Sequence, residues 1–149
     1  MLYKIIILTL MVLVHPISSC DDMDAIRWSY HEVKSEAELN QLLKEIEGLD
    51  CDKKIPYLAS LIMRQAEFTS WPHKKLGYFN DGKKMLENYL SAYPNSIEAH
   101  YIRLLTQKNV PSLLNYKQNI LEDKQFVEQH LKSADLSEDY KRIMAQNIH

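Results

Sequence analysis

Residues 76–105 read LGYFNDGKKMLENYLSAYPNSIEAHYIRLL, and this stretch decides the fold. Apolar residues recur in it at intervals of three and four, which is the period of a helix with one buried face. They are Leu76, Phe79, Leu86, Tyr89, Leu90 and Tyr93 before the break, and Ile97, Tyr101, Leu104 and Leu105 after it. Pro94 interrupts a helix, and Ser96 is a residue type that caps the next one. The stretch therefore predicts two helices joined by a sharp turn.

Gly82 falls near the middle of the first of these helices. A glycine there costs about 1 kcal/mol of helix stability relative to alanine. The sequence leaves two interpretations open. Either another helix packs closely against Gly82, or the helix breaks near Asn80-Asp81-Gly82.

The same period continues on both sides of this stretch, and its start and stop signals divide the chain into further helices. Ser35 and Glu38 have the spacing of a capping box, so Ser35 either begins a second helix or marks a kink in one long helix. Pro56 and Pro72 are suited to a first helical turn. The remaining apolar stripes are Ile26-Tyr30-Val33-Ala37, Leu39-Leu42-Leu43-Ile46, Leu58-Leu61-Ile62-Ala66, Ile120-Val127-Leu131-Ala134 and Tyr140-Ile143-Met144.

No stretch alternates with the period of two that a surface strand shows. We expect an all-α domain over residues 20–149, with six or seven helices stacked as antiparallel hairpins.

Composition argues against several classes of protein. The chain has 149 residues and only three glycines, against about 10 expected at the average frequency of ~7%. A β-sandwich or a nucleotide-binding α/β fold needs more glycines for its turns and phosphate loops. The net charge of −2 removes the electrostatic case for non-specific nucleic-acid binding.

Residues 1–19 have the anatomy of a secretory signal. Lys4 precedes the unbroken apolar run IIILTLMVLV at residues 5–14, and small residues follow. This run is too short for a membrane-spanning helix of ~20 residues. We therefore expect an exported chain that begins at Cys20 after cleavage.

The exit sequence Ile17-Ser18-Ser19-Cys20 resembles the lipobox of bacterial lipoproteins. The resemblance implies a lipid on the Cys20 thiol, cleavage before Cys20 and a protein anchored to a membrane of the cell envelope. The alternative is simple secretion, in which Cys20 closes a disulfide with Cys51, the one other cysteine. Both states remain open from the sequence.

A second resemblance covers about a quarter of the chain. Gly82, Leu86, Pro94 and the following Asn95-Ser96-Ile97-Glu98-Ala99 resemble the second helix and exit turn of a tetratricopeptide repeat. The segments Pro94–Glu98 and Asn109-Val110-Pro111 are also similar to small exported bacterial helical proteins without an assigned activity. Both resemblances imply a scaffold of α-hairpins with a binding role, and neither supplies catalytic residues.

The search for chemistry in the sequence is mostly negative. His31-Glu32 begins like a zinc-protease helix, but Ser35 stands where the second histidine would be. The chain has neither a Gly-x-Ser-x-Gly nucleophile turn nor a glycine-rich phosphate loop. We therefore predict no metal, no cofactor and no catalytic residue, and a protein that is not an enzyme.

For two charged residues and a group of aromatic residues, the sequence leaves open whether they are buried in the structure or exposed for binding. Asp123 falls on the apolar stripe that begins at Ile120, so it is either buried and paired or locally exposed. Arg103 lies on the far side of its helix from the apolar stripe and could pair with Asp123 or Glu98, be solvated, or belong to a ligand site. The clustered aromatics Trp71, Tyr78, Phe79, Tyr89, Tyr93 and Tyr101 serve either as core or as a recognition surface.

We expect function in the segment Trp71–Asp123, with Trp71, Tyr78 and Arg103 as candidate partner-binding residues because Trp, Tyr and Arg are common binding anchors. For Trp71 itself, packing into the core is the favoured expectation. The leading hypothesis is a lipid-anchored envelope module that binds a protein or peptide. The alternatives are a small envelope enzyme or enzyme subunit with a site built from distant residues, and a structural lipoprotein that spaces envelope layers.

Overall fold

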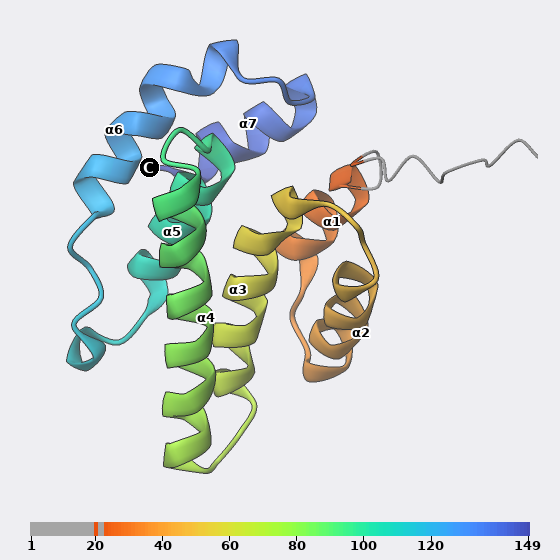
Figure 1. The fold of residues 1–149 in the computed structure, drawn as a ribbon, viewed down its shortest axis with the longest axis vertical. Coiled ribbons are helices and arrows are strands. Elements are labelled where there is room, and N and C mark those ends of the chain that lie inside the picture. The colour runs from red at the N-terminus through yellow and green to blue at the C-terminus, as the bar shows by residue number, and fades with distance from the viewer. Residues whose placement is uncertain (1–19, 21–22) are drawn as a thin grey trace, which may run out of the picture.

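The computed structural model describes Cys20 and residues 23–149 of the chain. The predicted signal segment, residues 1–19, lies outside the described residues. The described part contains seven α-helices and no strand (Figure 1). They are α1 (Met23–Glu32), α2 (Glu36–Glu47), α3 (Ile55–Arg64), α4 (Pro72–Ala92), α5 (Ile97–Asn109), α6 (Ile120–His130) and α7 (Glu138–Asn147). The predicted all-α fold with six or seven helices is confirmed.

Local sequence signals set most of the helix boundaries. The Ser35 hydroxyl accepts from the Glu38 amide while the Glu38 carboxylate accepts from the Ser35 amide, so a complete capping box starts α2. Ser35 therefore begins a second helix and does not mark a kink. Ser96 and Ser137 cap α5 and α7 through their hydroxyls in the same way.

Helices α3 and α4 form the most extensive helix pair in the described part. Helix α4 runs without a break from Pro72 to Ala92, and Gly82 faces α3. A Cβ atom at Gly82 would meet the Ala59 carbonyl oxygen at 2.4 Å and the Met63 Cγ at 2.5 Å. The close-packing interpretation of Gly82 is thus correct, and the alternative of a helix break is wrong.

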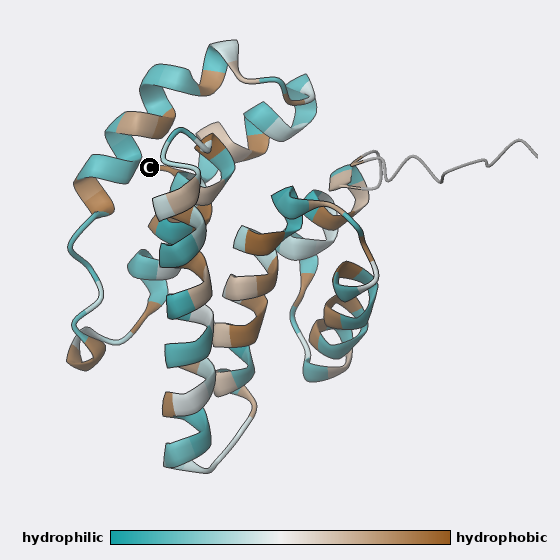
Figure 2. Ribbon diagram, in the orientation of Figure 1, coloured by the Kyte–Doolittle hydropathy of each residue, from teal (hydrophilic) through white to brown (hydrophobic). Residues whose placement is uncertain are grey.

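Helix α3 is the centre of the core. It lies between the α1–α2 pair on one side and α4 and α5 on the other (Figure 1), and it is hydrophobic along most of its length (Figure 2). Tyr57, Ala59 and Leu61 have no exposed surface at all. Full burial of a side chain of the size of Leu61 stabilises a fold by about 1.5–3 kcal/mol, so α3 contributes strongly to the core.

Helix α5 is also covered on two sides, with α3 and α4 against one face and α6 against another. Its polar residues Glu98, His100, Arg103, Thr106 and Gln107 are consequently buried together with its apolar ones. Among the described helices, none is both long and apolar enough to span a bilayer.

Candidate functional site

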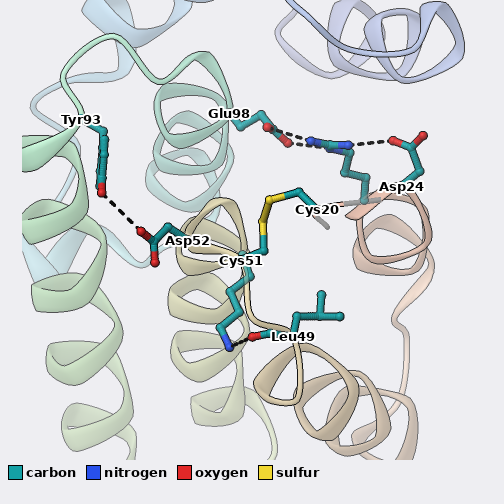
Figure 3. Close-up of a disulfide and its surroundings, with 9 residues drawn as sticks. Cys20, Asp24, Leu49, Cys51, Asp52, Tyr93 and Glu98 are labelled. Carbon is teal, nitrogen blue, oxygen red and sulfur yellow. Dashed lines mark hydrogen bonds and ion pairs between the residues drawn. A yellow bond between two sulfur atoms is a disulfide. The ribbon is translucent and has the colours of Figure 1, made fainter. Parts of the chain in front are cut away.

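A disulfide joins the start of the described chain to the turn before α3. Cys20 and Cys51 form this bond, with their Cα atoms 5.5 Å apart (Figure 3). A sulfur in a disulfide is not free to carry a thioether-linked lipid. Of the two states that the sequence leaves open for Cys20, the structure contains the disulfide with Cys51. The lipidated state stays a prediction.

A buried polar cluster joins helices that are distant in sequence. The Arg27 guanidinium donates to both carboxylate oxygens of Glu98, at 2.7 Å and 3.0 Å, and also to Asp24 at 2.7 Å (Figure 3). The Tyr57 hydroxyl donates to Glu98 at 2.6 Å. Since that proton is used, the Tyr140 hydroxyl donates to the Tyr57 oxygen across 2.7 Å. These contacts hold α1, α3, α5 and α7 together.

The surroundings of Tyr57 and Arg27 keep both side chains protonated. Burial, and then the neighbouring Tyr140 and Glu98, raise the pKa of Tyr57 well above its ordinary value. Burial lowers the pKa of Arg27, but hydrogen bonds and charge attraction from Glu98 raise it by more, so Arg27 stays a cation. A tyrosine that holds its proton and an arginine that is already ion-paired are structural groups, because neither is free to act as a base or a nucleophile.

A second buried cluster lies between α4, α5 and α6. Asp123 on α6 is completely buried and accepts two bonds of 2.7 Å from the Arg103 guanidinium. It also pairs with His100 Nδ1 at 2.6 Å, and His100 Nε2 donates to the Pro94 carbonyl at 2.8 Å. The third Arg103 nitrogen reaches Glu87 on α4 at 3.0 Å. Both charges of the central pair are thus matched within the protein.

The candidate role of Arg103 as a partner-binding residue does not agree with this geometry. Arg103 is only 7% exposed, and every guanidinium nitrogen is used by Asp123 or Glu87. The alternative of an ion pair with Asp123 is the one present in the structure. Glu98, the other partner considered, pairs with Arg27 instead, a contact across 71 residues for which the sequence carries no local signal.

Trp71 ends the turn between α3 and α4, and Tyr78 lies in the second turn of α4; we call residues 68–78 the hairpin tip. Trp71 immediately precedes α4 and is 62% exposed, so the expectation that it packs into the core is wrong. Leu76, expected on the buried stripe of α4, is 50% exposed. Tyr78 is half-buried. The structure brings Trp71 and Tyr78 to the same tip and places Arg103 elsewhere, among buried residues of α5.

Two hollows of the described surface are small. One of about 190 Å³ lies between α1 and α2 and is lined by Ser29, Glu32, Val33, Glu38, Gln41, Leu42 and Glu45. Another, of about 50 Å³, lies between α2 and the hairpin tip and includes Tyr78. Both are below the ~300–1,000 Å³ of pockets that enclose small ligands. Within Cys20 and residues 23–149, no three potential metal-ligating side chains come together.

Every buried side-chain nitrogen and oxygen in the described residues has a hydrogen-bond partner. In a comparison with models of protein families, with curated proteins and with solved structures, the chain matches none of them.

Proposed function

We propose that the chain is an exported, non-catalytic helical module of the bacterial envelope that binds a protein or peptide partner through its hairpin tip. The single observation that supports this most is the exposure of Trp71, which is 62% accessible at the end of the α3–α4 helix pair. A tryptophan that is covered by a partner contributes strongly to the binding free energy, and Trp is a common hot-spot residue of protein interfaces.

The placement of the tip suits presentation to a partner. The Tyr93 hydroxyl at the end of α4 reaches the Asp52 carboxylate, next to Cys51, at 3.4 Å (Figure 3). The disulfide therefore lies at one end of the α3–α4 pair and Trp71 at the other. Helix α4 has 21 residues, which corresponds to about 30 Å at 1.5 Å per residue. An attachment near Cys20 would leave Trp71 about one helix length away from it.

Two features favour binding over catalysis. The buried polar clusters use their charges internally, around Glu98 in one case and around Asp123 in the other. The resemblance of Gly82–Ala99 to a tetratricopeptide repeat also points to a binding scaffold. The alternative hypothesis of an enzyme with a site assembled from distant residues has less support, because the two hollows described above are small and no three potential metal ligands come together among the described residues.

The membrane attachment is a separate part of the proposal. A lipid on Cys20 and the Cys20–Cys51 disulfide exclude each other, because both use the same sulfur. We take the disulfide as the state of the folded domain and the lipidated form as the alternative. Labelling of the wild type and of Cys20→Ser with a fatty-acid analogue decides between them, since only a lipoprotein takes up label and loses it in the variant.

Photo-crosslinking in the intact cell envelope tests the binding role. A photoreactive residue in place of Leu76, at the tip, should give a crosslink to a specific protein. The matched control places it at Leu113, which is 86% exposed on the turn between α5 and α6. We expect Trp71→Ala to weaken the Leu76 crosslink and Trp28→Ala, which changes the other partly exposed tryptophan, to leave it unchanged.

A melting curve keeps the crosslinking result interpretable. Because Trp71 is largely exposed, Trp71→Ala should change the free energy of unfolding by no more than about 0.5 kcal/mol. Crosslinks of equal strength at positions 76 and 113, or no crosslink from the tip at all, would show that the hairpin tip is not the binding surface.

A further inference from the structure

We infer that the partner segment that docks on the hairpin tip is an acidic peptide, with Asp or Glu side chains on either side of an apolar one. This inference rests on the proposed function and adds the chemistry of the partner. It follows from the distribution of charge along the chain and from the side chains that the tip exposes.

Charge is strongly segregated between neighbouring parts of the fold. Residues 23–50, which include α1 and α2, contain seven acidic and three basic side chains, a net charge of −4. Residues 53–92, which include α3 and α4, contain three acidic and seven basic side chains, a net charge of +4. A chain that is acidic overall thus has a net positive α3–α4 pair, and the part of this charge that lies at the hairpin tip, Lys74 and Lys75, attracts an anionic partner.

The basic residues of the tip are available for a partner. Lys74 and Lys75 are both exposed in the first turn of α4, and neither forms an ion pair within the described residues. They are three and four residues after Trp71, at the N-terminus of a 21-residue helix whose free amides carry partial positive charge. A carboxylate placed next to this first turn of α4 is attracted both by the two lysine side chains and by the partial positive charge of the helix N-terminus.

The apolar part of the tip is narrow. Trp71 and Leu76 are its two largely exposed apolar side chains among the described residues, and Lys74 and Lys75 lie between them in sequence. One apolar side chain flanked by carboxylates would match this arrangement. Burying a tryptophan and one leucine gives the contact energy, while the charges give orientation and rate of association.

Two other occupants fit the structure less well. A lipid surface would be met by only these two apolar side chains, and binding to a membrane surface scales with the apolar area that is buried in it. A second copy could offer the acidic hollow between α1 and α2. There, however, Glu38 already accepts bonds from the Lys34 and Ser35 amides, and Glu45 accepts one from Gln41.

The test uses the full mature chain with Trp28→Phe, so that Trp71 is the one tryptophan that reports on binding. The probe is a synthetic 20-residue peptide in which Leu is flanked by Glu, and the comparison peptide has Gln at each Glu position. We expect the Glu peptide to shift the Trp71 emission to the blue and to bind at least about tenfold more tightly than the Gln peptide. Raising the salt concentration from 50 to 500 mM should lower the affinity for the Glu peptide by about tenfold, because salt screens exposed charges.

Charge reversal at the tip supplies the matched control. The double variant Lys74→Glu/Lys75→Glu should lose at least about tenfold in affinity for the Glu peptide. Reversal of two exposed lysines elsewhere, Lys44→Glu/Lys117→Glu, gives the same net charge and should retain the affinity.

Four results would overturn the inference. The first is equal binding of the Glu and Gln peptides, or binding of neither. The second is a blue shift with phosphatidylglycerol vesicles but not with the peptide, which would assign the tip to a lipid surface. The third is self-association of the protein alone, measured by sedimentation and lost in the double variant. A tip crosslink in cells that persists in Lys74→Glu/Lys75→Glu would refute the acidic partner and still leave the proposed binding role standing.

Discussion

Gly82 on α4 lies directly against the backbone of Ala59 on α3, so closely that a Cβ atom at Gly82 would stand 2.4 Å from the Ala59 carbonyl oxygen. That oxygen belongs to the main chain of a helix and cannot move alone. The glycine therefore sets the distance between the two helices that form the hairpin. The helix propensity lost at Gly82 is offset by packing that no larger residue permits.

Replacement of two glycines in the same helix separates these effects. Gly82→Ala should destabilise the protein by about 1–3 kcal/mol, because the cost of overpacking exceeds the gain of about 1 kcal/mol in helix propensity. Gly77 is the control, since a Cβ atom there meets nothing within 4 Å. Gly77→Ala should raise the melting temperature. If thermal melts show Gly82→Ala to be as stable as Gly77→Ala, the close approach of α3 and α4 is not tight in solution.

Removal of the Asp123 carboxylate should be among the most damaging single changes in the chain. In Asp123→Ala, Arg103 loses two hydrogen bonds and His100 loses one, and the Arg103 charge is left largely buried. A broken buried ion pair typically costs about 3–5 kcal/mol. Chemical denaturation measures the change. Glu122→Ala, at the exposed neighbouring position, should change stability by less than about 0.5 kcal/mol.

Reduction of the disulfide should lower stability without removing the helices. Cys20 and Cys51 are 31 residues apart, and a closed loop of this length gives about 3–4 kcal/mol by the chain-entropy relation. We expect a lower melting temperature in the presence of a reductant, and the same lower value for Cys51→Ser with or without reductant. A mature protein whose melting temperature does not respond to reductant would have no disulfide to lose.

Acidification should destabilise the protein through His31. Burial, together with the positive charge of Arg64, lowers the pKa of His31, although the charge of Glu32 opposes the shift. As the pH falls through about 6.5, the ordinary value, the unfolded chain takes up this proton before the folded one does. Stability is therefore lost as the pH decreases. Melts at pH 7.5 and 5.5 should differ by less in His31→Gln than in the wild type, and an equal difference would remove His31 as a cause.

Much of the fold can be predicted from the sequence because its signals are local. The capping box at Ser35, the prolines that open α3 and α4 and the serine caps of α5 and α7 each act within one helical turn. The helical period identifies the apolar stripes in the same way. These features give the number of helices and most of their boundaries.

The candidate site could be predicted only in part, because exposure depends on which helix packs where. Trp71 precedes a helix whose first turns extend beyond the core, so a residue type expected inside is outside. Arg103 is buried because α4 and α6 both cover α5, and its partner Asp123 comes from another helix. Lys74 and Lys75 are visible in the sequence beside Trp71, but their availability depends on the absence of acidic neighbours in space.

The hydrogen bonds of Glu98 also affect when the domain can fold during its synthesis. Synthesis proceeds from the N-terminus, so Arg27 emerges 71 residues before the carboxylate that neutralises it, and Tyr57 emerges 83 residues before the Tyr140 hydroxyl that completes the cluster. Until α5 has been made, Arg27 and Tyr57 lack the Glu98 carboxylate, and until α7 has been made, Tyr57 also lacks the Tyr140 hydroxyl, so an incomplete chain gains less by closing around these groups. A nascent chain of this protein should therefore remain open, and susceptible to proteases, until α7 is released, and folding should then occur in a single late step.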